Sequence, residues 1–140
     1  MITYVDTSTL LKRLLDEDGS AEADVIWDAA DVLASAVTVV VEARAALSAA
    51  ERGGRISAAE HRDAKVGLLD PFEEVAFVEI TDDLIAQAAD LAEHESLRGY
   101  DAVHLAAALM VEATVLTSAD VGLCDAAARR GLHVANPLDT

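Results

Sequence analysis

Short apolar runs alternate with longer amphipathic segments along this chain. The runs are rich in Val, Ile and Leu and lack polar alternation, which is typical of strands buried on both faces of a sheet. Five such strands are expected, at residues 2–5, 32–35, 75–80, 115–116 and 133–135. Helices are expected between them, over roughly residues 9–18, 21–30, 38–52, 57–69, 81–95, 100–111 and 120–130. Strands separated by helices predict an α/β fold with a mostly parallel sheet.

Several helix ends are marked by residues with clear local chemistry. Ser57-Ala58-Ala59-Glu60 has the form of a capping box, in which each terminal side chain bonds the backbone of the other. Gly53-Gly54 is expected to stop the preceding helix, and Pro71 to end the following one. Thr81 or Asp82 is expected to cap the next helix.

Composition narrows the class of protein. The 140 residues include 26 Asp and Glu against 10 Lys and Arg, a formal net charge of −16, yet 53% of them are hydrophobic. That apolar content excludes a disordered acidic tail, and no apolar run approaches the ~18 residues of a membrane span. A single cysteine, Cys124, and no visible signal peptide predict a cytoplasmic protein. The charge by itself disfavours indiscriminate binding to nucleic acid or anionic membranes.

Four of the acidic residues lie in apolar surroundings rather than in turns. Asp6 and Asp120 each follow a predicted strand, Glu42 follows three valines, and Asp101 opens an almost wholly apolar helix. For Asp6, Asp101 and Asp120 the alternative is a helix N-cap, and for Glu42 an exposed helix position. In a parallel sheet with helices on both faces, ligands bind beyond the carboxyl ends of the strands, where these acids are expected.

A cluster of carboxylates has a definite chemical requirement. Neighbouring carboxylates repel one another, so a cation is needed to compensate their charge. Oxygen ligands without a cysteine pair or a HExxH motif favour a hard divalent ion, Mg²⁺ or Mn²⁺, over zinc. Such ions activate water for attack on a phosphodiester, which is the chemistry of metal-dependent nucleases.

Motifs along nearly the whole chain resemble one known family. In order, they are Tyr4-Val5-Asp6-Thr7-Ser8, Val41-Glu42-Ala43-Arg44, Tyr100-Asp101-Ala102-Val103-His104-Leu105-Ala106-Ala107-Ala108, Leu116-Thr117-Ser118-Ala119-Asp120 and the tail from Ala126 to Pro137. The chain is similar in these segments to PIN-domain ribonucleases, specifically the VapC-type toxins of bacterial toxin–antitoxin pairs. The family often has Thr-x-Asp where this chain has Ser118-Ala119-Asp120, so Asp120 is the least secure match.

The resemblance implies a fold, an activity and partners. Residues 1–140 would form a single PIN domain that cleaves RNA and is inhibited by a cognate VapB-type antitoxin, as a homodimer within a larger toxin–antitoxin complex. An acidic pocket would hold one or two Mg²⁺ or Mn²⁺ ions. The metal-binding and catalytic residues would be Asp6, Glu42, Asp101 and Asp120. Ser118 and Thr7 would orient the site, although Thr7 is equally suited to start a helix.

Other polar residues have competing interpretations. His104 lies three residues after Asp101 on the same helix face, but its apolar helix favours a buried histidine with satisfied ring nitrogens over a metal ligand. Arg44 and Arg98 are candidate contacts for RNA phosphates, and ordinary surface charge is the alternative.

Two rival functions remain open at this point. An aspartate-nucleophile phosphohydrolase also has an Asp after its first strand, but it requires a second acid two residues later, where Ser8 stands. A non-catalytic binding module with a PIN-like fold is the other rival. Acids at all four positions argue against it, and a test for bound Mg²⁺ or Mn²⁺ separates it from a nuclease.

Overall fold

The computed structural model describes residues 1–139 and contains one five-stranded sheet. Its strands are β1 (Ile2–Val5), β2 (Val32–Ala36), β3 (Val75–Val78), β4 (Val115–Thr117) and β5 (His133–Ala135). All four pairings are parallel and the strand order is β3-β2-β1-β4-β5, which confirms the predicted α/β class. The order places β1 at the centre, and the chain moves to opposite sides of it with β2 and with β4.

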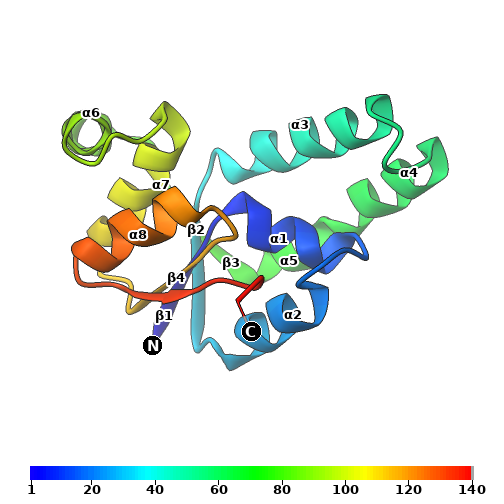
Figure 1. Ribbon diagram of the computed structural model, residues 1–140, viewed down its shortest axis with the longest axis horizontal. Helices are drawn as coiled ribbons and strands as arrows, with labels where there is room; N and C mark the ends of the chain where they lie inside the picture. Colours follow the sequence, from blue (N-terminus) through cyan, green and yellow to red (C-terminus); the bar gives the residue numbers. More distant parts are fainter. Residues whose placement is uncertain (140) are drawn as a thin grey trace.

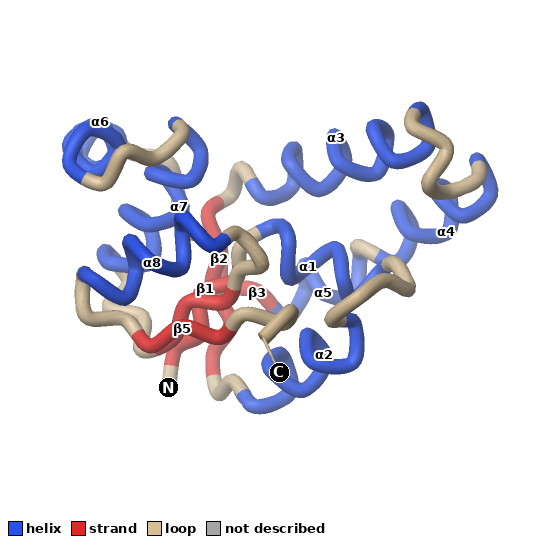
Figure 2. The backbone as a smooth tube through the Cα atoms, in the orientation of Figure 1, coloured by secondary structure: helices blue, strands red, loops and turns tan. Residues whose placement is uncertain are grey.

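Eight helices connect and cover the strands within residues 1–139 (Figures 1 and 2). They are α1 (Thr7–Leu14), α2 (Ser20–Ala29), α3 (Val39–Arg52), α4 (Ala58–Gly67), α5 (Leu69–Glu74), α6 (Asp82–His94), α7 (Gly99–Met110) and α8 (Val121–Arg129). In Figure 1, α6, α7 and α8 gather on one side of the sheet, and α1 to α5 on the other. None of these helices is long and apolar enough to cross a membrane.

Alternation along the central strands supplies a separate core to each face of the sheet. Tyr4 and Ala34 belong to the core built with α6, α7 and α8, whereas the next residue, Val5, packs with Leu10 and Leu47 in the other. Successive strand residues point to opposite faces, so a strand covered by helices on both sides is apolar at every position. This explains why the strands appear in the sequence as unbroken apolar runs.

Local signals placed most helix ends correctly. The capping box is present: the Ser57 hydroxyl accepts the Glu60 N–H at 3.1 Å, and the Glu60 carboxylate accepts the Ser57 N–H at 3.0 Å. Thr81, rather than Asp82, caps α6 through a bond from the Leu84 N–H.

Over residues 1–139 the structure has eight helices where seven were expected, and several boundaries differ from the prediction. Pro71 does not end a helix but lies in the first turn of α5, a position where its missing N–H would have no partner in any case. The first helix ends at Leu14 rather than near residue 18. Strand β3 ends at Val78, short of Ile80, and its last residue is in register with Ala36 of β2.

Candidate active site

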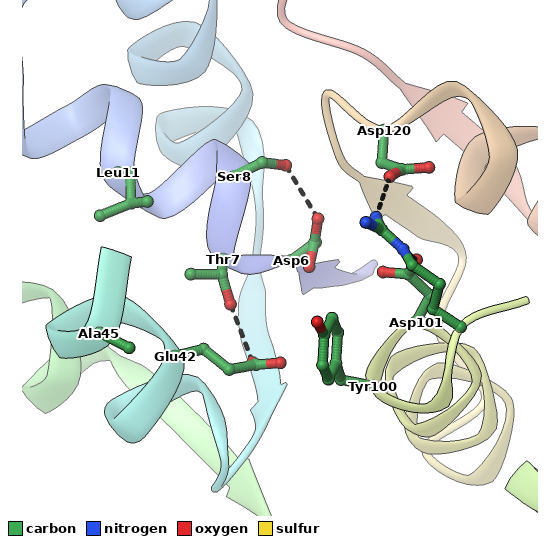
Figure 3. Close-up of a pocket in the computed structure, with 10 residues that line it drawn as sticks. Asp6, Thr7, Ser8, Leu11, Glu42, Ala45, Tyr100, Asp101 and Asp120 are labelled. Atoms are coloured by element: carbon green, nitrogen blue, oxygen red, sulfur yellow. Dashed lines mark hydrogen bonds and ion pairs between the residues drawn. The ribbon is translucent and has the colours of Figure 1, made fainter. Parts of the chain in front are cut away.

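The four candidate acids line one pocket at the carboxyl edge of the sheet (Figure 3). The pocket has a volume of about 410 Å³ and is open to solvent. It lies at the ends of the neighbouring strands β1 and β4, whose following helices, α1 and α8, pack on opposite faces of the sheet. Sheets of this type bind ligands at such a point. Its lining residues are Asp6, Thr7, Ser8, Leu11, Glu42, Ala45, Arg98, Tyr100, Asp101 and Asp120.

Asp6 is the most buried of the four acids, with 6% of its surface exposed. It occupies the N-cap position of α1, yet its side chain makes no cap hydrogen bond. Instead its Oδ2 accepts hydrogen bonds from the hydroxyls of Ser8, at 2.8 Å, and Ser118, at 2.7 Å. The N-cap alternative is therefore wrong for this side chain, which two hydroxyl donors hold at the pocket.

Asp120 serves as a cap and faces the pocket at the same time. Its Oδ1 accepts the Leu123 N–H at 3.0 Å, which is an N-cap bond of α8. Its Oδ2 accepts a hydrogen bond from Arg98 Nη2 at 2.9 Å. The two alternatives raised by the sequence are thus compatible, because each uses a different oxygen.

Asp101 lies in the first turn of α7 and is also paired with Arg98, whose Nε donates to Oδ2 at 3.1 Å. Burial raises the pKa of the Asp101 carboxyl above its usual range. The Arg98 bond opposes that rise, whereas the charges of Asp120 and Asp6 add to it. A carboxylate in this environment gains from a further cation.

Glu42 extends from the first turn of α3 into the pocket, with 21% of its side chain exposed. Its Oε2 accepts the Thr7 hydroxyl at 2.9 Å and lies 2.7 Å from Nε2 of His104. Thr7 thus contacts a site carboxylate, that of Glu42. Ser118 likewise contacts a site carboxylate, that of Asp6.

His104 is buried, as expected for a histidine on an apolar helix. The sequence did not indicate its partners: besides Glu42, Nε2 lies 3.5 Å from Asp6 Oδ1, and Nδ1 lies 2.7 Å from the Tyr4 hydroxyl. Burial lowers the pKa of His104, but the hydrogen bond with Glu42 and the charges of Asp6 and Glu42 outweigh it and raise the pKa overall. The only signal in the sequence was its spacing from Asp101.

The two candidate RNA-binding arginines differ in position. Arg98 bridges Asp101 and Asp120 at the pocket, with 67% of its side chain exposed. Arg44 is exposed on α3 and does not line the pocket. Ser8 and Tyr100 do line it, and neither was singled out from the sequence as a site residue.

The donor chemistry suits a hard divalent ion, because four carboxylates supply only oxygen. Among residues 1–139, however, no three His, Cys, Asp or Glu side chains are close enough together to hold a metal ion as they stand. The contacts explain this: Arg98 is bonded to Asp101 and Asp120, while Glu42 and Asp6 face His104. The four carboxylates have the ligand chemistry that such an ion requires, and the Arg98 guanidinium is the cation that pairs with Asp101 and Asp120.

Comparison with known proteins places this fold in a family. The sequence model of the PIN domain matches residues 3–129. Ribonuclease VapC45 of Mycobacterium tuberculosis is 38% identical over 132 residues, which cover 94% of this chain and 87% of that protein.

Solved structures agree with the fold. M. tuberculosis VapC20, described as a toxin that cleaves the sarcin-ricin loop, has a TM-score of 0.68 at 20% identity, covering 93% of this chain and 95% of its own. VapBC2 from Rickettsia felis, solved with a DNA fragment from its promoter, has a TM-score of 0.64 at 15% identity, covering 97% and 98%. On the sequence match and the relative's identity, the chain belongs to the PIN-domain family.

Proposed function

We propose that this protein is a ribonuclease toxin of the VapC type that hydrolyses phosphodiester bonds in RNA. The observation that carries the proposal is the convergence of Asp6, Glu42, Asp101 and Asp120 on one solvent-open pocket. The 38% identity to Ribonuclease VapC45 over most of both chains supports the substrate class.

The four carboxylates would hold Mg²⁺ or Mn²⁺ together. A bound divalent ion supplies a water of lowered pKa and neutralises charge on the phosphodiester. The hydroxyls of Ser8 and Ser118 fix the orientation of Asp6 through Oδ2. Its other oxygen, Oδ1, lies on the side of His104, 3.5 Å from Nε2.

The remaining residues have roles that follow from their positions. A site carboxylate oxygen that does not hold the divalent ion would accept the proton of the attacking water. Asp101 and Asp120 would hold a divalent ion in place of their bonds to Arg98, and Arg98 would then bind a phosphate oxygen of the RNA at the pocket. Arg44 is exposed on α3 outside the pocket and would contact the RNA chain further along.

Substitution of the acids tests the assignment. Asp6→Asn and Asp101→Asn are expected to abolish cleavage of RNA in the presence of Mg²⁺ or Mn²⁺, while far-UV circular dichroism shows an unchanged fold. Asp90→Asn, on the exposed side of α6 and away from the pocket, is the matched control and should cleave at the wild-type rate. A folded Asp6→Asn variant that cleaves like wild type would refute the site.

Two further measurements address the rival functions. A non-catalytic module should bind no Mn²⁺ above background in calorimetry, whereas the nuclease should bind it with an affinity that Asp6→Asn reduces. A phosphohydrolase would form a phospho-aspartate at Asp6. The Ser8 hydroxyl bonded to Asp6, in place of a second acid, argues against that chemistry.

A VapB-type antitoxin is the proposed protein partner, and a homodimer the proposed unit of its complex. A hollow of about 410 Å³ between α1 and α4 supports a docking segment with apolar side chains, since Leu14, Leu15 and Ile56 line it. Its charged lining is mixed, with Arg13 and Arg55 beside Asp16, Glu60 and Asp63. Sequencing of the neighbouring reading frames, co-expression with a short one and light scattering of the purified complex test both statements. A monomeric toxin that fails to capture the neighbouring product would refute them.

A further inference from the structure

His104 connects a buried tyrosine to the acidic pocket. The ring is 1% exposed, its Nδ1 is 2.7 Å from the Tyr4 hydroxyl, and its Nε2 is 2.7 Å from Glu42 Oε2. The three side chains come from β1, α7 and α3, so the contact joins the centre of the sheet to helices on both of its sides. Tyr4 and His104 also pack edge to face, with ring centroids 5.6 Å apart.

The hydrogen bonds of Tyr4 determine where its proton points. The backbone N–H of Ala36 donates to the Tyr4 oxygen at 2.8 Å, so this oxygen is already an acceptor there. A phenol is protonated at neutral pH, and the bond from Ala36 does not use its hydrogen. Its single hydrogen is then free to be donated to His104 Nδ1.

That donation fixes the tautomer of the histidine. A neutral imidazole that accepts a hydrogen bond at Nδ1 carries its own hydrogen on Nε2. Nε2–H faces Glu42 Oε2 at 2.7 Å and Asp6 Oδ1 at 3.5 Å. In the imidazolium form the Tyr4 bond reverses, but Nε2–H still donates to Glu42.

Glu42 needs such a constraint more than the other acids do. Its side chain has more rotatable bonds than that of an aspartate, and it extends into the pocket from the first turn of α3 (Figure 3). Two donors, Thr7 Oγ1 and His104 Nε2, converge on the same oxygen, Oε2. The second oxygen, Oε1, is thereby turned toward the pocket.

We propose that Tyr4 and His104 act as positioning residues for Glu42, holding its carboxylate by an Nε2–H bond so that Oε1 is presented to a divalent cation. The proposal rests on the proposed nuclease function for its consequence in catalysis, but the hydrogen-bond arrangement and cation affinity are testable without activity. Neighbours that orient a ligating carboxylate or histidine typically change metal affinity or activity about 10- to 100-fold when they are replaced.

A pair of substitutions at one position separates hydrogen bonding from packing. His104→Met fills a similar volume without a donor, whereas His104→Gln places an amide N–H near the position of Nε2. In calorimetry with MnCl₂ and full-length protein, His104→Met should weaken binding about 10- to 100-fold, and His104→Gln should retain most of the affinity. In RNA cleavage the same order should appear in kcat more than in KM.

A second histidine offers a matched control. His61 lies 2.8 Å from Glu51 through Nδ1, which is the same pair of residue types at the α3–α4 end of the molecule, outside the pocket. His61→Met should leave Mn²⁺ affinity and kcat unchanged. If folded His104→Met binds Mn²⁺ like wild type, or if Gln and Met at position 104 are equally weak, the positioning role is wrong.

Nuclear magnetic resonance tests the arrangement directly and covers the case in which His104→Met does not fold. Long-range ¹H–¹⁵N spectra of the wild type should show a proton on Nε2 of His104 at every pH at which the protein is folded. Tyr4→Phe should give a mixture of tautomers at high pH. A wild-type ring protonated on Nδ1 alone would overturn the proposal even if the protein cleaves RNA. If the spectra are as expected and the protein does not cleave RNA, only the proposed function is refuted.

Discussion

Ser118 is expected to be among the most sensitive polar residues of this protein. Its side chain is fully buried, donates to Asp6 Oδ2 at 2.7 Å and accepts the Asp120 N–H at 3.0 Å. Replacement by Ala removes both bonds, leaves the Asp120 N–H without its acceptor and leaves Asp6 with Ser8 as its remaining hydroxyl donor.

The magnitude follows from the character of the two bonds. A hydrogen bond to a charged group contributes about 1.5–3 kcal/mol and one between neutral groups about 0.5–1.5 kcal/mol, so Ser118→Ala should cost about 2–4 kcal/mol. That is a large part of the roughly 5–15 kcal/mol by which a domain of this kind is stable. For a chain of this length it corresponds to a drop in Tm of about 6–12 °C.

Urea unfolding followed by circular dichroism measures the loss. The slope of the transition should not change, since the same surface is exposed on unfolding, and the midpoint should fall. Ser48→Ala is the matched control, because its hydroxyl accepts only from the exposed Arg52 on the same helix, and it should alter the free energy of unfolding by less than about 0.5 kcal/mol. A loss at Ser118 no larger than that at Ser48 would refute the reasoning.

Three other outcomes are expected. Ser57→Ala, which breaks the capping box, should lower the free energy of unfolding by about 1 kcal/mol in urea, and Ser57→Thr should restore most of it. Cys124 should react with iodoacetamide at pH 8 about a hundredfold more slowly in the native protein than in urea, because burial, and then the charge of Asp120, raises its pKa to about 11, and only the thiolate reacts. Equal rates would contradict this. Arg98→Gln should lower the Tm of the metal-free protein, since Asp101 and Asp120 then face each other without a cation, and MnCl₂ should recover it; an unchanged Tm would show that the bridge does not contribute.

Much of the fold was predictable because its signals are local. Buried parallel strands give apolar runs, and caps such as Ser57 and Thr81 act within three residues of themselves. The error at Pro71 has the same origin in reverse, since proline is compatible both with the end of one helix and with the first turn of the next. Whether Pro71 ends a helix or lies in the first turn of one depends on how α5 packs.

The site was predictable in its acids but not in their partners. Asp6 and Asp120 follow strands, so the edge at which they lie follows from the topology of a parallel sheet. The bonds that determine their chemistry join residues far apart along the chain, as with Ser118 and Asp6 or Tyr4 and His104. A single sequence carries no signal for such pairs, and for that reason His104 could be predicted as buried but not as a neighbour of Glu42.

The central position of β1 has a consequence for the synthesis of the protein. On the ribosome β1 can pair with β2 once residue 36 has emerged, but its other edge stays open until β4 emerges, some eighty residues later in the chain. Asp101, Ser118 and Asp120 all arrive in that last part. A nascent chain therefore carries Asp6 and Glu42 without a complete pocket, so the cell would meet an active nuclease only after β4 and Asp120 have emerged.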